Sequence, residues 1–163
     1  MNLNNFTIKA QEILQYAQQV AFNHKNPNIE TSHLLEALLA DKEGPIPYLL
    51  KKNNVSLGFL ERKLDEQIEK LPKIQGSEPA QVISREGNNA ILRAGAVLKE
   101  FGDEFVTPEH LLIGLVQVND DTTRLLKDAG LTEKGLISSI KELRKGNTVS
   151  SQTESQQYHA LQK

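Results

Sequence analysis

TSHLLEALL, residues 31–39, and PEHLLIGLV, residues 108–116, share most of their apolar pattern and carry a histidine at the same place. The two histidines, His33 and His110, are 77 positions apart. In both stretches the leucines recur at the three- and four-residue spacing that places side chains on one face of a helix. Because a match at a fixed offset indicates an internal repeat, the sequence predicts two copies of one helical unit.

The offset extends well beyond this phrase. Thr7 and Ser84 are also 77 apart, and each precedes an amphipathic pattern, so each is predicted to cap a helix by accepting a hydrogen bond from a free amide. Farther along, the offset drops to 76 across turn signals such as Gly130. The apolar pairs are Ile13 with Ala90, Leu14 with Ile91, Ala17 with Ala94, Val20 with Val97, Ile29 with Val106, then Leu49 with Leu125, Leu60 with Leu136 and Leu64 with Ile140.

These offsets predict an all-α fold of eight helices, built as two four-helix repeats related by a pseudo-two-fold axis in one compact domain. A unit of four short helices cannot bury its own apolar face, so the two must pack together. We expect repeat one over 1–70, a crossing loop over 71–83, repeat two over 84–145 and a flexible polar linker over 146–163. The expected helices are 8–24, 32–41, 46–53, 57–70, 85–101, 108–118, 121–129 and 133–144.

Composition limits the classes of function. The chain has 163 residues, a formal net charge of −2 and no cysteine, which removes disulfides, thiolate catalysis and cysteine metal sites. The acidic balance argues against nucleic acid and anionic membranes as partners. The alternative is a small helical protein that binds nucleic acid through a helix-turn-helix, and the small basic cluster of Lys141, Arg144 and Lys145 would support it. No secretion signal or long apolar run is present, so we expect a cytoplasmic protein without a membrane partner.

Motifs for chemistry are missing from the sequence. It has no phosphate-binding glycine loop and no nucleophile turn, so the chain itself is not expected to be an enzyme. Acidic pairs such as Asp120-Asp121 lie at helix starts, where they complement the helix dipole. The histidines lack paired spacing for a metal, so His33 and His110 are expected to bond locally or pack at the seam between repeats, with a pH-sensitive contact as the alternative.

Three stretches together resemble the Clp N-terminal repeat domain, a family found at the front of ATP-dependent unfoldases and disaggregases. They are FTIKAQEILQYAQQVA at 6–21, IETSHLLEALL at 29–39 and VTPEHLLIGLV at 106–116. The resemblance covers residues 1–145. The tail, GNTVSSQTESQQYHALQK, is similar to the linker and first residues of the ATPase domain in the disaggregase branch. We therefore expect a fragment that stops before the motor.

The resemblance implies a non-catalytic domain that binds unfolded or aggregated polypeptides and passes them to the ATPase ring behind it. ATP and Mg would belong to the absent ATPase domains, so no cofactor is expected in this chain. The domain would partner its own ATPase domains in a full-length hexamer, whereas the isolated chain would be monomeric. The alternative is a docking domain for a folded adaptor protein, as in the protease-associated branches of the family.

The resemblance also implies a shallow groove at the start of the first helix and the face of the fifth, closed by the loop before the sixth. Simpler explanations exist for most of its residues: periodicity makes Ile91 and Val97 core residues, Thr7 is a helix cap, and Asp103 follows Gly102 in a helix-ending turn. The residues implied are Thr7 at the rim, Ile91 and Val97 on the apolar floor, Asp103 and Glu109 as an acidic edge, and His110 beside them.

Overall fold

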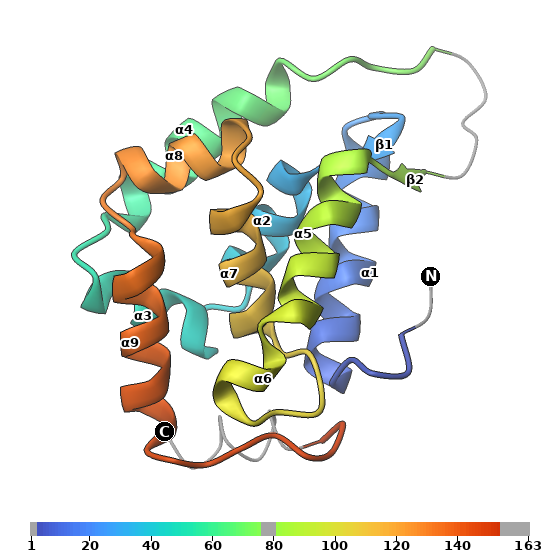
Figure 1. Cartoon of the computed structure of the whole chain (residues 1–163). Coiled ribbons are helices and arrows are strands. Elements are labelled where there is room, and N and C mark those ends of the chain that lie inside the picture. The colour runs from blue at the N-terminus through green and yellow to red at the C-terminus, as the bar shows by residue number, and fades with distance from the viewer. Residues whose placement is uncertain (1–2, 76–80, 154–163) are drawn as a thin grey trace.

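The structure is a computed structural model that describes residues 3–75 and 81–153 (Figure 1). Helices dominate it, and the two strands are two residues each. The elements, in chain order, are α1 (Ile8–Asn23), β1 (Asn28–Ile29), α2 (Thr31–Ala40), α3 (Pro45–Lys52), α4 (Leu57–Glu69), β2 (Val82–Ile83), α5 (Arg85–Ala96), α6 (Leu98–Phe101), α7 (Pro108–Gln117), α8 (Asp121–Asp128) and α9 (Glu133–Arg144).

All eight expected helices are present, and the fifth has a break. The expected helix over 85–101 divides at Val97, whose side chain is buried, into α5 and the single-turn α6. Helix α6 then stops at Gly102, which has a φ of 68°, and the Asp103 amide donates back to the Leu98 carbonyl at 3.0 Å. A residue without a side chain suits this left-handed position, so Gly102 fixes the direction of the following loop.

The two repeats exchange their N-terminal segments. In the parallel pair of β1 and β2, Ile29 lies beside Ile83, and a parallel bridge joins Phe6 to Val106 at the equivalent place in the other repeat. The Ser84 amide donates to the Ile29 carbonyl at 3.0 Å. Its counterpart, the Thr7 amide, donates to Val106 at 2.9 Å. Each repeat thus anchors the first helix of the other.

Helix packing follows the same symmetry (Figure 1). Within the repeats α1 packs on α2 and α5 packs on α7, while α2 and α7 meet at the centre. Between the repeats α3 packs on α9 and α4 on α8, so the third helix of each repeat meets the fourth helix of the other. This reciprocal arrangement is what a pseudo-two-fold axis requires. The predicted all-α, two-repeat fold is confirmed.

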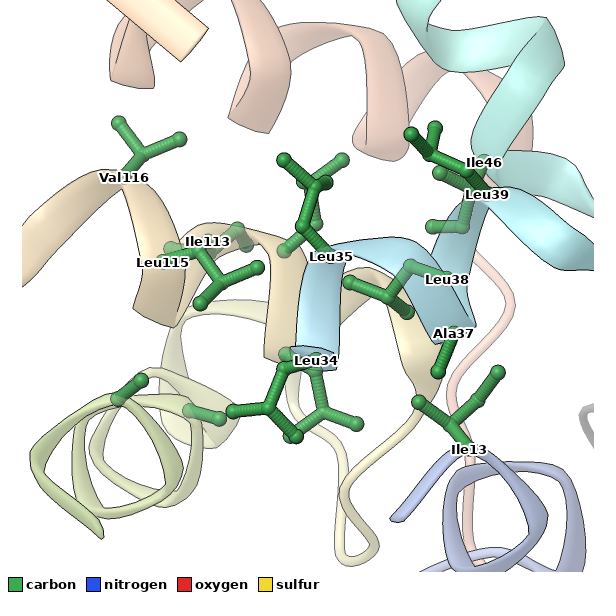
Figure 2. Close-up of a cluster of buried hydrophobic side chains, with 14 of the residues drawn as sticks. Ile13, Leu34, Leu35, Ala37, Leu38, Leu39, Ile46, Ile113, Leu115 and Val116 are labelled. Atoms are coloured by element: carbon green, nitrogen blue, oxygen red, sulfur yellow. The ribbon is translucent and has the colours of Figure 1, made fainter. Parts of the chain in front are cut away.

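The core is built from the two quoted stretches. Leu34, Leu35 and Leu38 on α2 are at most 1% exposed, and Ile113 and Leu115 on α7 are fully buried (Figure 2). Burying a leucine or isoleucine side chain stabilises a fold by about 1.5–3 kcal/mol, so these helices hold the repeats together.

Helices α5 and α7 lie unusually close to each other. A Cβ on Gly114 of α7 would lie 2.2 Å from the Ala90 carbonyl oxygen on α5. Only glycine fits at that approach. The repeat-one position that matches Gly114 at the offset of 77 holds Ala37 on α2, so the glycine that permits this approach belongs to repeat two alone.

Helix length bears on membrane insertion. Helix α1, with 16 residues, is shorter than the roughly 20 needed to span a bilayer. Across the described ranges, no helix combines the length and apolar character of a membrane span.

Candidate functional site

An apolar groove of about 210 Å³ lies beside α1, where that helix meets the end of α2 and the start of α3. We call it the α1 groove. Its position follows from the packing of α1 on α2, which leaves one side of α1 facing outward. The residues that line it are Lys9, Glu12, Ile13, Tyr16, Ala37, Leu38, Ala40, Asp41, Pro45, Ile46 and Pro108.

Its floor is apolar and its edge is charged. Ile13 of α1 points toward Ala37 and Leu38 of α2 (Figure 2), and the Tyr16 ring stands at the side with 48% of its surface exposed. Lys9 forms an ion pair with Glu12 at 3.9 Å on the rim. An apolar floor with charges of both signs around it can hold apolar side chains without demanding one sequence.

The second repeat has a related hollow on the outer face of α5. It is lined by Asn89, Leu92, Arg93, Ala96 and Val118, and has a volume of about 410 Å³. Asn89 and Arg93 stand 77 positions after Glu12 and Tyr16, so the hollow occupies the place equivalent to the α1 groove. The aromatic ring has been replaced by a guanidinium, which makes this hollow more polar.

A wider polar hollow of about 830 Å³ lies where α4 and α8 meet the start of α2. Its walls carry both charges, with Lys63 and Glu66 on α4 and Asp121 and Arg124 on α8. Such a surface places charges of both signs beside Leu71 and Leu125, and it is suited to the charged exterior of a folded protein.

The six residues implied by the resemblance are all buried. None of the six lines the α1 groove, although Pro108, the chain neighbour of Glu109, does. A direct contact between them and a substrate stays a prediction. Their exposed fractions are 0% for Thr7, 7% for Ile91, 4% for Val97, 7% for Asp103, 1% for Glu109 and 0% for His110.

Three of the six serve the fold locally. The Thr7 hydroxyl accepts the Ala10 amide at 3.1 Å, which confirms the predicted cap on α1. Ser84 caps α5 in the same way through the Gly87 amide at 3.0 Å. Ile91 and Val97 belong to the hydrophobic core, as their periodicity indicates.

The other three meet in a buried ionic cluster with Arg144 at the end of α9. The Arg144 guanidinium donates to both Asp103 carboxylate oxygens, at 3.0 and 2.8 Å, and to Glu109 at 3.2 Å. The second Glu109 oxygen is buried without a hydrogen-bond partner among the described residues. The Phe101 ring of α6 covers the cluster, with its centroid 5.6 Å from the Arg144 guanidinium carbon. The cluster ties α9 to the start of α7.

His110 completes this cluster as a neutral hydrogen-bonding group. Its Nδ1 accepts the Thr107 amide at 2.9 Å, so that nitrogen carries no proton, and Nε2 then donates to Asp103 at 2.8 Å. In repeat one, the Nδ1 of His33 accepts the Glu30 amide at 2.8 Å. The prediction that both histidines bond locally in their first turns is confirmed.

Repeat one has no charges at the equivalent positions. Asn26 stands where Asp103 does, at an offset of 77, and its side-chain oxygen meets Nε2 of His33 at 2.8 Å. Ser32 takes the place of Glu109, and Ile68 takes the place of Arg144 at the offset of 76. The ionic cluster is therefore an addition of the second repeat to a shared histidine framework.

The charges adjust the pKa values within the cluster. Burial alone would raise the pKa of Asp103, but the hydrogen bonds from His110 and Arg144 outweigh it and hold that pKa below its usual value. Burial would likewise lower the pKa of Arg144, but the charge of Glu109 and the hydrogen bond to Asp103 raise it. Asp103 and Arg144 are thus both held in their charged forms.

Sequence reasoning missed Arg144 and the α1 groove. The sequence predicts that Arg144 forms a small basic cluster with Lys141 and Lys145, but its side chain is 3% exposed, so it does not contribute to a basic patch for nucleic acid. The signal was present in the offset, because an arginine stands where the first repeat has an apolar residue. The groove gave no such signal, because the periodicity of Ile13 is that of an ordinary core residue.

The geometry of two interlocked repeats can be compared with known proteins. The family model for the Clp repeat (R) N-terminal domain matches residues 5–129. The chain belongs to the Clp N-terminal domain family. The chaperone protein ClpB of Bacteroides thetaiotaomicron is 40% identical over 163 residues, which are 100% of this chain and 19% of that protein. ClpB of Clostridium perfringens is 29% identical, again over 100% of the chain and 19% of the relative.

Solved structures of Clp N-terminal domains share the fold. The Hsp104 N-terminal domain from Candida albicans superimposes with a TM-score of 0.80 at 21% identity, covering 91% of this chain and 97% of that one. The N-terminal domain of ClpD from Arabidopsis thaliana gives 0.67 at 21% identity, covering 90% and 98%. This Clp N-terminal domain therefore spans about a fifth of the length of its ClpB relatives and most of the solved domains.

Proposed function

We propose that this domain recognises substrates for an ATP-dependent disaggregase of the ClpB type. It binds unfolded or aggregated polypeptide in the α1 groove and passes it to an ATPase ring. The observation that carries the proposal is the groove itself, with its apolar floor beside the exposed Tyr16 ring. Unfolded chains differ from folded ones in exposing apolar side chains, and a floor of this kind discriminates on that property.

The size of the groove supports weak binding. A hollow of about 210 Å³ accepts only a few side chains. An affinity in the micromolar range or weaker, about −8 kcal/mol at best, suits repeated capture and release. A tighter site would hold the polypeptide against the pull of the ring.

The remaining parts of the machine belong to the same proposal. The domain itself is non-catalytic, and ATP and Mg are bound by ATPase domains outside this chain, within a hexamer in the cytoplasm. Its support is the similarity to ClpB proteins, of which this chain spans 19%.

A second candidate function is docking of a folded adaptor protein. The polar hollow between α4 and α8 favours it, because Lys63, Glu66 and Arg124 offer charges of both signs to a complementary surface. An adaptor would bind stoichiometrically and would depend on salt, whereas capture in an apolar groove would depend on salt only weakly.

Capture and docking are separated by an NMR titration of the isotope-labelled chain with reduced, carboxymethylated lactalbumin, which stays unfolded, beside native lactalbumin. We expect the unfolded form alone to shift amides around Ile13, Tyr16 and Leu38. The Tyr16→Asp variant should bind at least tenfold more weakly. Phe22→Asp is the matched control, because Phe22 is 46% exposed on the same helix and lies outside the groove.

Three other results would redirect the interpretation. Shifts confined to Thr7, Asp103 and His110, with none in the α1 groove, would return the site to the position implied by the sequence resemblance. Equal losses in Tyr16→Asp and Phe22→Asp would indicate a non-specific effect of charge on α1. If neither form of lactalbumin causes localised shifts at millimolar concentration, direct capture is wrong and adaptor docking becomes the working function.

A further inference from the structure

The residues after α9 fold back over the domain. Lys145 and Gly146 both adopt positive φ values, of 49° and 88°, and together reverse the chain. The following residues then run beneath α6 toward the start of α1 (Figure 1). A left-handed lysine is disfavoured relative to glycine, so the reversal has a conformational cost that the contacts beyond it must offset. We call residues 149–152 the returning segment.

The returning segment is held first at the loop after α6. Its Val149 amide donates to the Asp103 carboxylate at 2.8 Å, and its Val149 carbonyl accepts the Glu104 amide at 2.7 Å. The Val149 side chain is 4% exposed, whereas the flanking Thr148 and Ser150 are exposed. Because Asp103 is also held by Arg144 and His110, the ionic cluster presents a fixed acceptor to the segment.

It is held again at the N-terminus of α1. The Gln152 carbonyl accepts the Ile8 amide at 2.9 Å, one of the first-turn amides that a helix cannot pair internally. The Gln152 side-chain amide donates to the carbonyls of Asn4 at 3.1 Å and Phe6 at 3.2 Å. Lys9, the next residue of α1, lines the α1 groove, so the segment ends beside the opening of the groove.

We propose that the surface under the returning segment is a binding site for extended polypeptide, and that residues 149–152 occupy it in cis and compete with substrate. We call this surface the α1 strip, formed by the Ile8 amide, the Glu104 amide and the Asp103 carboxylate. The proposal rests on the proposed function, because the competing ligand is the unfolded chain that the domain captures.

The chemistry of the α1 strip suits an extended chain of almost any sequence. It offers two amide donors and one carboxylate acceptor, all directed at main-chain groups, and it buries the side chain of Val149. Main-chain hydrogen bonds give affinity without reading side chains, as in peptides that bind along a strand edge. Any segment with a small apolar residue at the position of Val149 can make the same contacts.

Repeat one shows how a permanent version of this contact is built. There the crossing loop packs on the equivalent turn, with the Asn26 side chain donating to the Pro72 carbonyl at 2.9 Å and the Ile74 amide donating to Lys25 at 2.6 Å. That loop is anchored by α4 on one side and α5 on the other. Within the described residues, the returning segment is anchored by α9 alone, so it can leave the strip without unfolding a helix.

The returning segment lowers the apparent affinity for substrate, because substrate can bind only to the fraction of molecules in which the α1 strip is free. If the segment covers the strip about nine-tenths of the time, the apparent dissociation constant is about tenfold above the intrinsic one. Releasing the segment should restore that factor. Val149→Asp achieves the release, because it places a second carboxylate next to Asp103, and Val149, although buried, does not belong to the main hydrophobic cluster.

The first test measures binding of reduced, carboxymethylated lactalbumin to the full chain and to Val149→Asp by fluorescence anisotropy. We expect about tenfold tighter binding by the variant, and lactalbumin should then shift the Ile8 and Glu104 amides. Val82→Asp is the matched control, a valine that is 62% exposed, and it should bind like the unmodified chain. Unchanged or weaker binding by Val149→Asp overturns the competition.

The second test does not depend on the proposed function. A peptide of residues 146–153, GNTVSSQT, is titrated into labelled Val149→Asp, and saturable shifts at Ile8 and Glu104 are expected at millimolar concentration. The same peptide with aspartate for valine should cause none. Absence of shifts with the first peptide overturns the strip as a binding site, even if lactalbumin still binds at Tyr16. Peptide binding without any lactalbumin binding overturns the proposed function, and the competition with it.

Discussion

The Nε2 atom of His110 lies 2.8 Å from the Asp103 carboxylate, and the Nε2 atom of His33 lies at the same distance from the Asn26 side-chain oxygen. One framework thus places a neutral imidazole against a carboxylate in repeat two and against an amide in repeat one. The two histidines explain why the same phrase occurs twice in the sequence: each closes the first turn of a central helix and ties it to the loop before it.

The buried pair of His33 and Asn26 predicts a loss of stability in mild acid. Burial, with a smaller contribution from the charge of His24, lowers the pKa of His33 from 6.5 to about 4. Between these values the unfolded chain binds a proton that the folded chain does not, so stability falls as the pH drops from 6.5 to 4 and is fully present above 6.5. The loss amounts to about 3 kcal/mol. Urea denaturation at several pH values measures it.

The matched comparison uses two variants. His33→Gln removes the titrating group, so its stability should change less with pH over the same window, although it starts lower because the cap is lost. His24→Gln removes only the smaller of the two causes that lower the pKa of His33, so most of the pH dependence should persist in it. A wild-type curve that is flat between pH 4 and 6.5 would mean that His33 is protonated in the folded state.

The ionic cluster predicts a difference in stability between two kinds of variant. Replacing all of its charged residues by their repeat-one counterparts should leave the domain more stable than replacing Asp103 alone. Asp103→Asn leaves Arg144 with one carboxylate in a buried site and should destabilise the domain by about 3 kcal/mol. Adding Glu109→Ser and Arg144→Ile copies the residues of repeat one and removes every unpaired charge. Guanidinium denaturation should show the triple variant to be more stable than Asp103→Asn alone.

Acid provides an independent check of this cluster. Because the folded pKa of Asp103 is depressed, its contribution is present above the unfolded value, near 4, and is lost as the pH falls through the folded value. The triple variant should therefore lose less stability below pH 4 than the wild type. Asp121→Asn is the control, since Asp121 is exposed and pairs with Arg124 on the surface. If the triple variant is less stable than Asp103→Asn, the cluster as a whole stabilises the domain.

The repeats and the caps could be read from the sequence because apolar spacing and hydroxyl residues act locally, within one helical turn. The partner of Asp103 could not, because Arg144 is 41 positions away and only the packing of α9 on α7 brings it near. The returning segment was hidden for a related reason. Its composition is that of a flexible tether, and the role of Val149 depends on its hydrogen bonds to Asp103 and Glu104 in the loop after Gly102.

The contact between α5 and α7 predicts opposite results for two glycines. Gly114→Ala would place a Cβ 2.2 Å from the Ala90 carbonyl oxygen, so the helices must separate, at a cost of about 3 kcal/mol. Gly95→Ala, on α5 itself, meets no atom within 4 Å and should stabilise the domain by about 0.5–1 kcal/mol through better helix propensity. Thermal denaturation of both variants measures the difference. Equal effects would show that the two helices are not held in close contact.

Thr7 and Ser84 cap equivalent helices, so variants of the two residues test whether Thr7 has a role beyond capping. Thr7→Ala and Ser84→Ala each remove one buried or half-buried cap and should each cost about 1 kcal/mol in urea denaturation. Because the Thr7 side chain is fully buried, Thr7→Ala should bind carboxymethylated lactalbumin as Ser84→Ala does, once both are compared under conditions where they are folded. Thr7→Ser keeps the hydroxyl and should restore the stability. A specific loss of lactalbumin binding in Thr7→Ala, restored by Thr7→Ser, would instead make the hydroxyl a substrate contact that becomes exposed when the returning segment leaves the α1 strip.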